Sequence, residues 1–123
     1  MNQSDKEQIN QLDGLKTEWY ENGQKKLEFS IKDSFILDGL QTWWYENGQK
    51  MQEITWKDGK EDGLNTEWYE NGQKMWEGFY KDGKEDGLHT KWYENGEKKV
   101  EYNYKDRRFI SKKEWNEDGS VKE

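Results

Sequence analysis

The sequence contains no cysteine and no proline, and its single histidine is His89. Without cysteine, disulfide bonds and thiolate metal sites are excluded. No run approaches the roughly 20 apolar residues that a membrane-spanning helix needs, and the stretch from Met1 to Asn10 lacks the apolar centre of a signal peptide. We therefore expect a cytoplasmic protein, or an exported one if a signal peptide has been removed.

Hydrophobic residues are also scarce, at 29% of the chain against 38% charged residues. That composition alone is close to the composition of disordered chains. Eight Trp, seven Tyr and four Phe can each bury a large area, however, so the aromatic residues predict a thin folded structure. The formal net charge of −7 is unfavourable for contact with phosphate backbones or anionic lipid headgroups. We expect no nucleic-acid partner, and a membrane partner is disfavoured.

The chain is an internal repeat. The pentapeptide Trp-Tyr-Glu-Asn-Gly occurs four times, followed by a weaker fifth copy, and the five copies begin at Trp19, Trp44, Trp68, Trp92 and Trp115. Spacings of 25, 24, 24 and 23 residues separate them, and such a fixed period indicates an array of small structural units. We predict an array over residues 13–123, with four hairpin units and one partial unit. Residues 1–12 are predicted to be an N-terminal cap or a disordered segment.

Each unit has the alternation of two half-buried strands. Leu64, Thr66 and Trp68 alternate with polar residues before an Asn-Gly pair, and a second alternating arm follows it. The fold class that this predicts is all-β, a single-layer antiparallel β-hairpin meander. The strands are expected over residues 14–20, 25–32, 39–45, 50–57, 63–69, 74–81, 87–93, 98–105 and 110–116.

Side-chain parity selects the turn type, because directly opposed residues in a hairpin share a face. A three-residue loop from Glu70 to Gly72, with glycine in the left-handed conformation, pairs Trp68 with Lys74 and Thr66 with Trp76. The same rule applied to the loop of residues 81–83 pairs Trp76 with Leu88. Each repeated tryptophan is thereby expected to cover a glycine and to stack on the lysine opposite it.

The opposite face is expected to carry the repeated tyrosines. Since recurring residues hold the fold of a repeat array, residues that differ between units are free to recognise a partner. Trp43 is predicted to face Met51 across its hairpin, while the equivalents of Trp43 in the other units are charged. An exposed aromatic and methionine patch often marks an interface. The predicted partner-binding residues are Trp43, Met51, Met75, Phe79, Tyr45 and Tyr69. Sequence drift and a self-association surface are the alternatives.

Chemistry-bearing residues fit structural roles. His89 occupies a position held by Lys16, Gln41 and Asn65 in the other units, so we expect it to face solvent. The recurring glutamates lie on a flat sheet with no pocket, and the Asp-Gly loops at Asp58 and Asp82 lack the ligand spacing of a calcium loop. We expect no catalytic residue, no metal site and no cofactor.

The unit that begins Asp-Gly-Leu-Asn-Thr-Glu-Trp-Tyr-Glu-Asn-Gly at Asp62 resembles the bacterial variant of the MORN repeat, found in proteins labelled YwqK-type antitoxins. The resemblance covers about Asp13 to Gly119. It implies a single-layer hairpin array and, by the label, a protein that binds and neutralises a toxin. Two departures are the longer link of residues 32–39 and the sequence Phe-Ile-Ser at Phe109, where Asp-Gly-Leu is expected.

The predicted function is that of a non-enzymatic scaffold that binds another protein, with antitoxin-like activity implied by the resemblance. The alternative is a peripheral membrane or phosphoinositide-associated module, which the resemblance to eukaryotic MORN arrays implies and the acidic charge disfavours. Homo-oligomerisation stays open.

Overall fold

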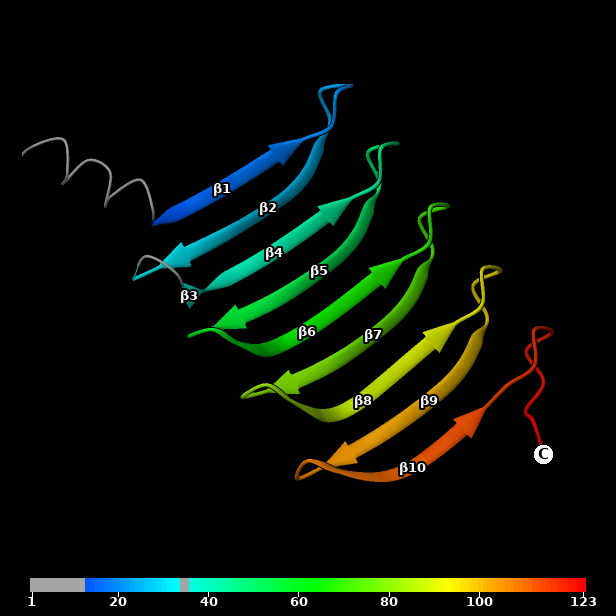
Figure 1. The fold of residues 1–123 in the computed structure, drawn as a ribbon. Coiled ribbons are helices and arrows are strands. Elements are labelled where there is room, and N and C mark those ends of the chain that lie inside the picture. The colour runs from blue at the N-terminus through cyan, green and yellow to red at the C-terminus, as the bar shows by residue number, and fades with distance from the viewer. Residues whose placement is uncertain (1–12, 34–35) are drawn as a thin grey trace, which may run out of the picture.

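A computed structural model describes residues 13–33 and 36–123, and the predicted N-terminal segment lies outside them. The described residues form ten strands of one antiparallel sheet and contain no helix (Figure 1). The all-β hairpin meander is thus confirmed. The strands are β1 (Gly14–Trp19), β2 (Lys25–Lys32), β3 (Ile36–Leu37), β4 (Gly39–Trp44), β5 (Lys50–Lys57), β6 (Lys60–Trp68), β7 (Lys74–Lys81), β8 (Lys84–Trp92), β9 (Lys98–Lys105) and β10 (Arg108–Glu114).

Neighbours in the chain are neighbours in the sheet. The order is β1-β2-β4-β5-β6-β7-β8-β9-β10, and the short β3 pairs with β2 beside the longer link. In Figure 1 the Asn-Gly turns lie along one edge of the ladder of hairpins and the linking turns along the other. The sheet is a single layer in which each unit contacts the units beside it.

The three-residue hairpin turn is confirmed. The amide of Gly72 donates to the carbonyl of Tyr69 at 3.0 Å, and the amide of Tyr69 donates to the carbonyl of Gln73 at 2.8 Å. Gly72 has φ of 89°, a conformation that glycine adopts at low cost, and Trp68 pairs with Lys74 as expected.

Beyond that pair, the predicted register of Thr66 with Trp76 is wrong. Met75 is an extra residue on the second strand, so Glu67 pairs with Trp76 and Thr66 pairs with Glu77. The equivalent irregularity occurs in the other three hairpins. A β-bulge reverses which face the following side chains occupy, so Trp76 lies on the face opposite Thr66.

The predicted linking turn is also wrong. Lys81 pairs with Lys84 across a two-residue turn, in which Asp82 and Gly83 have φ of 50° and 83°. Positive φ at both central residues is the type I′ turn that matches the twist of a hairpin. A further register shift between Gly78 and Tyr80 then pairs Trp76 with Lys91 and not with Leu88.

One face of the sheet repeats most of its side chains in every unit, and we call it the uniform face. In the third unit, the Thr66 hydroxyl donates to Glu77 at 3.1 Å, and Lys74 forms an ion pair with Glu77 at 2.9 Å. The Lys74 ammonium lies 5.7 Å from the ring centroid of Trp92 in the next unit. The lysine thus stacks on the following unit's tryptophan and not, as predicted, on the tryptophan opposite it.

The tyrosines and asparagines of the Trp-Tyr-Glu-Asn-Gly segments link consecutive units. Tyr69 donates its hydroxyl proton to the carbonyl of Trp92 at 2.6 Å, and Asn71 donates to the carbonyl of Glu94 at 3.2 Å. Equivalent tyrosine bonds, of 2.5 to 2.8 Å, are made by Tyr20, Tyr45 and Tyr93. These contacts satisfy backbone carbonyls and hold neighbouring turns in line.

The turn glycines Gly48, Gly72 and Gly96 are each covered by the preceding unit's glutamine, where the sequence led us to expect tryptophan. At Gly72, a Cβ atom would lie 3.3 Å from the Gln49 side-chain oxygen.

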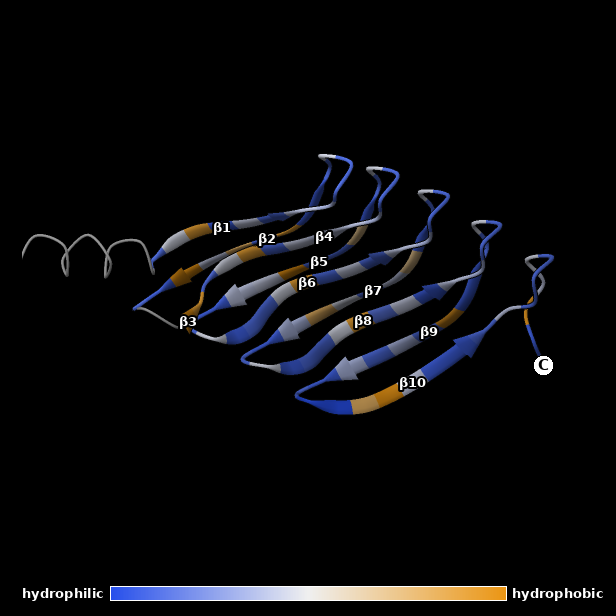
Figure 2. Ribbon diagram, turned by 45° about the horizontal axis from the view of Figure 1, so that its top comes forward, coloured by the Kyte–Doolittle hydropathy of each residue, from blue (hydrophilic) through white to orange (hydrophobic). Residues whose placement is uncertain are grey.

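Little of the sheet is enclosed. The buried hydrophobic side chains of the described residues are Leu27 and Val100, and most strands are hydrophilic with short hydrophobic bands (Figure 2). The described part of the chain has no helix that is both long and apolar enough to cross a membrane. Stability therefore comes from half-buried aromatic contacts and contacts between units.

Candidate functional site

The second face of the sheet differs from unit to unit, and we call it the variable face. The residue after the bulge is Leu27, Gln52, Trp76 or Val100 in successive units, and the residue two further on is Phe29, Ile54, Gly78 or Tyr102. On the uniform face, by contrast, every complete unit has the same Leu, Thr, Glu, Lys and Trp. Differences among the units are thus concentrated on one side of the sheet.

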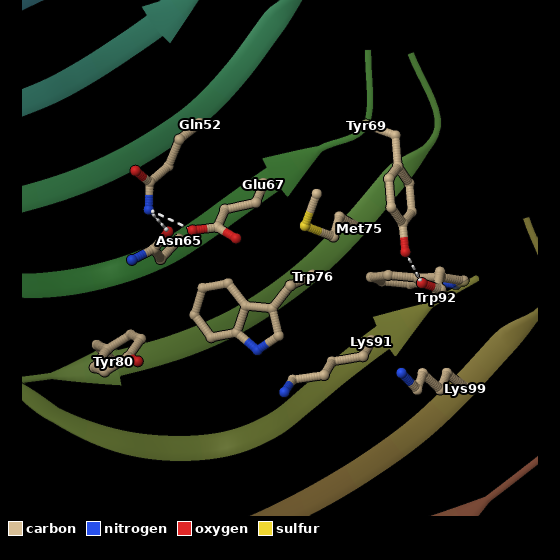
Figure 3. A pocket seen from close by; sticks show the side chains of 10 residues that line it. All are labelled: Gln52, Asn65, Glu67, Tyr69, Met75, Trp76, Tyr80, Lys91, Trp92 and Lys99. Atoms are coloured by element: carbon tan, nitrogen blue, oxygen red, sulfur yellow. Dashed lines mark hydrogen bonds between the residues drawn. The ribbon is translucent and has the colours of Figure 1, made fainter. Parts of the chain in front are cut away.

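The variable face is hollowed over its third unit. An open depression of about 600 Å³ lies across five strands, from β5 to β9 (Figure 3). Its lining residues are Gln52, Asn65, Glu67, Tyr69, Met75, Trp76, Tyr80, Lys91, Trp92 and Lys99. Two of the predicted partner-binding residues, Tyr69 and Met75, are among them.

Trp43, Met51 and Tyr45 lie outside this depression, in the preceding unit. Trp43 pairs with Gln52 in its own hairpin and with Leu27 of the unit before, so it does not directly face Met51 as predicted. Met51 is the bulge residue of its hairpin. Trp43 nevertheless shares the variable face, because its partner Gln52 bonds to Glu67 on that face.

Phe79 is on the wrong face for the predicted surface. It pairs directly with Leu64, which belongs to the uniform face, and its side chain is exposed there. The physical reason is the bulge at Met75, which shifts the parity of every later residue on β7. Phe79 and Met75 therefore do not share one docking surface.

One wall of the depression is polar. The Gln52 amide donates to Glu67 at 3.1 Å and to Asn65 at 3.3 Å, and the Asn65 amide donates to Glu61 at 2.7 Å. These side chains come from β5 and β6, where the register brings them side by side. The network fixes the Glu67 carboxylate at the rim, where it can accept hydrogen bonds from a partner.

The floor is aromatic and rests on His89. The ring centroids of Trp76, Tyr80 and Tyr104 lie 5.8, 5.3 and 5.0 Å from the imidazole. His89 is only 3% exposed, so the prediction that it faces solvent is wrong. Rings from the two neighbouring strands, β7 and β9, cover it, and its Nε2 donates to the Phe79 carbonyl at 2.9 Å.

Gly78 makes the room that His89 occupies. A Cβ atom on Gly78 would lie 2.3 Å from His89 Nδ1 and 2.7 Å from Trp76 Cζ2, which is closer than real Cβ contacts allow. The other units have Phe29, Ile54 and Tyr102 at this position. In the third unit, β7 therefore has a glycine in place of a large residue, and the His89 ring from the adjacent strand β8 fills the space.

Burial changes the acid–base behaviour of this cluster. Loss of solvation lowers the pKa of His89, which is kept neutral, and raises the pKa of Tyr80 to about 12. Burial also raises the pKa of Tyr69, so its hydroxyl stays protonated and able to donate to Trp92. The floor is therefore uncharged at neutral pH.

The wall opposite the amide network is cationic. Lys91 on β8 is exposed, and Lys99 is exposed on β9, with its ammonium 5.7 Å from the ring centroid of Tyr93. The depression thus places an apolar floor between two lysines and a carboxylate. Such a combination of apolar contact with charges of both signs suits a protein surface.

The described residues contain no group of three or more His, Asp or Glu that could hold a metal ion. The aspartates of the linking loops accept backbone hydrogen bonds. Asp38 accepts from the Asp58 amide at 3.0 Å, and Asp62 accepts from the Asp82 amide at 3.3 Å. Their recurrence is explained by these contacts between units.

Sequence reasoning missed Trp76 and Lys91 as members of the site. Parity counting without the bulge assigned Trp76 to the uniform face. The repetition of one threonine and one glutamate per unit could have revealed the correct register, because these two residues are bonded to each other.

Comparison with known proteins identifies the repeat. The MORN repeat variant matches four times, over residues 12–33, 37–58, 61–82 and 85–106, and no curated protein matches the chain. The matches cover more than half of the sequence and follow the hairpin units described above. The chain therefore belongs to the MORN repeat variant family.

Proposed function

We propose that this chain is a non-enzymatic scaffold that binds a protein partner through the depression on its variable face. The observation that carries this proposal is the concentration of unit-to-unit differences on one face, with the depression at their centre. In a repeat array, residues that hold the fold recur, whereas a binding surface departs from the repeat. Trp76 and Lys91 are departures of this kind, because no other unit has Trp at the first of these positions or Lys at the second.

The floor and walls define the chemistry of the partner. Trp76 offers a half-exposed aromatic anchor, and aromatic residues at the centre of an interface commonly dominate its affinity. Lys91 and Lys99 favour a carboxylate on the partner, while Glu67 favours a cation on the other side. We infer a partner segment that presents an apolar side chain between an acidic and a basic residue.

The specific activity that we propose is antitoxin-like: the chain binds a toxic protein and blocks it. This proposal rests on the resemblance of the units to those of proteins labelled antitoxins. The net charge of −7 makes a negatively charged membrane surface a poorer candidate.

The test uses one substitution at two equivalent positions. Met75→Lys places a residue that the array itself has at Lys26 and Lys99, so the hairpin is expected to tolerate it. Met51→Lys makes the same change in the neighbouring unit, outside the depression. Partners are captured from the host with the wild-type chain, and their affinities for both variants are measured by calorimetry.

We expect Met75→Lys to weaken binding by at least tenfold and Met51→Lys to change it much less. Equal affinities of Met75→Lys and the wild-type chain, with circular dichroism showing a folded variant, would refute the depression as the docking site. For the antitoxin proposal, expression of the captured partner should stop growth, and co-expression of this chain should restore it. A partner that is harmless when expressed alone would refute that part.

A further inference from the structure

The uniform face carries an uncharged stripe that crosses the sheet. Leu15 pairs with Ser30, Leu40 with Thr55, Leu64 with Phe79 and Leu88 with Asn103. We call these eight residues the leucine stripe. This row runs from β1 to β9 without one charged residue, in a chain with 38% charged residues. Hydrophobic bands near the beginning of β1 and β4 and near the middle of β6 and β8 are visible in Figure 2.

The leucines of this stripe are open to solvent. Leu15, Leu40, Leu64 and Leu88 are 65%, 55%, 50% and 52% exposed, and Phe79 beside Leu64 is exposed as well. Leucine is normally among the most buried residue types. An exposed leucine that recurs at the same place in every complete unit indicates an interaction surface.

We propose that the leucine stripe is the contact surface between two copies of this chain, packed face to face. Equivalent leucines lie two strands apart, which is about 9.6 Å in a sheet. A partner must present apolar groups at the same period to match them all. A second copy has this period because it has the same units, and a two-fold axis would bring identical stripes together with the units running in opposite directions.

Charge on the uniform face is compatible with this contact. The row beside the stripe holds lysine–glutamate ion pairs of 2.7 to 2.9 Å, formed by Lys25 with Glu28, Lys50 with Glu53, Lys74 with Glu77 and Lys98 with Glu101. Each pair is neutral overall. The negative charges that make the chain acidic therefore do not collect on this face, and the repulsion between two copies is a long-range effect that salt screens.

The face is large enough for a stable dimer. Nine strands in sequence, spaced by about 4.8 Å, and six residues along each strand give roughly 800 Å². A standard protein interface buries about 800 Å² on each partner, so the uniform face alone reaches that size. The docking depression on the variable face would stay free in such a dimer.

Sedimentation equilibrium of the full chain tests the proposal. The wild-type chain is expected to sediment at twice its 15.0 kDa mass and to associate more tightly as salt is raised. Leu64→Glu should weaken the association by at least about thirtyfold, because central anchors of an interface commonly cost this much and a two-fold axis places the change twice. Its control is Gln73→Glu, which makes the same charge change in an exposed turn, where the next unit already has Glu97.

Leu64 is half-exposed, so the variant should fold, and circular dichroism checks this. Leu40→Ser, which removes the side chain without adding charge, serves as the second variant and should also favour the monomer. A wild-type chain that is monomeric at about 100 µM would overturn the proposal, since interfaces of this size bind at micromolar or better. A dimer that both leucine variants leave intact would overturn it too, because the contact would then lie elsewhere.

Discussion

The pairing of Gly78 with His89 gives a prediction that can be worked out from distances. Gly78→Ala adds one methyl group where φ is not in the left-handed region, so the backbone itself permits alanine. The new Cβ would lie 2.3 Å from His89 Nδ1, and the hydrogen bond from His89 Nε2 to the Phe79 carbonyl restrains the ring from moving away. Overpacking of this kind typically costs about 1 to 3 kcal/mol, more than the roughly 0.5 to 1 kcal/mol that alanine would gain over glycine in an open strand.

His89→Asn should remove the clash with the imidazole, and the Trp76 indole, whose Cζ2 would lie 2.7 Å from the new Cβ, can then shift into the space that the ring leaves. In the neighbouring unit, Asn65 pairs directly with Ile54, so an asparagine at this position tolerates a large residue across from it. We therefore expect Gly78→Ala to be neutral or stabilising when His89 is already asparagine. The coupling free energy between the two substitutions should be about 1 to 3 kcal/mol, in the range measured for residues in direct contact.

Urea unfolding of the four proteins of this cycle, followed by tryptophan fluorescence, measures the coupling. The His89→Asn single variant is the control, and it should be less stable than the wild-type chain because it loses the ring contacts with Trp76, Tyr80 and Tyr104. Strictly additive changes in the free energy of unfolding would show that Gly78 and His89 do not compete for space. The account of the floor given above would then be wrong.

Two further predictions concern the same contacts. Because burial lowers the pKa of His89, the unfolded chain binds a proton more readily than the folded chain does. The free energy of unfolding should therefore fall as pH drops below about 6.5. His89→Asn should remove this part of the pH dependence, as measured by urea titrations at several pH values. Tyr69→Phe deletes the donor to the Trp92 carbonyl and should cost about 1 kcal/mol in thermal or urea unfolding, whereas Tyr104→Phe, whose hydroxyl makes no hydrogen bond among the described residues, should cost less; equal losses would contradict this role.

Much of the fold could be predicted because turn residues mark the ends of the strands in every repeat. Each Asn-Gly pair marks a hairpin, and each strand is long enough for its alternation to be read. The three-residue turn at Gly72 was predicted correctly, but the parity argument for it fails, because Thr66 and Trp76, which it placed on one face, lie on opposite faces.

The faces could not be predicted with the same method, because a bulge adds one residue without any diagnostic residue type. Met75, Met51, Lys26 and Lys99 fill the bulge position and have no common chemistry. Parity counting carries an error of one residue through the rest of the strand, which is why Trp76 and Phe79 were each assigned to the wrong face.

The candidate site was only partly predictable for a related reason. Tyr69 and Met75 were found from their types and their place in the repeat, but Gln52, Asn65 and Lys91 enter the depression from three different strands. Their proximity depends on the register between units, and no local pattern specifies it. The burial of His89 depends likewise on an absence, the missing side chain of Gly78, on the neighbouring strand.

The tyrosine hydroxyl bonds between units all run in one direction along the array. Each tyrosine donates to a carbonyl 22 to 24 residues later in the chain, and the series ends where Asn116 takes the tyrosine position and bonds within its own turn to Ser120. Each of these bonds links only two consecutive units, so duplication or deletion of a hairpin would leave the tyrosine bonds between the other units unchanged. An array built this way can change its length by whole units during evolution, and with it the area of each face, while every joint keeps the same geometry.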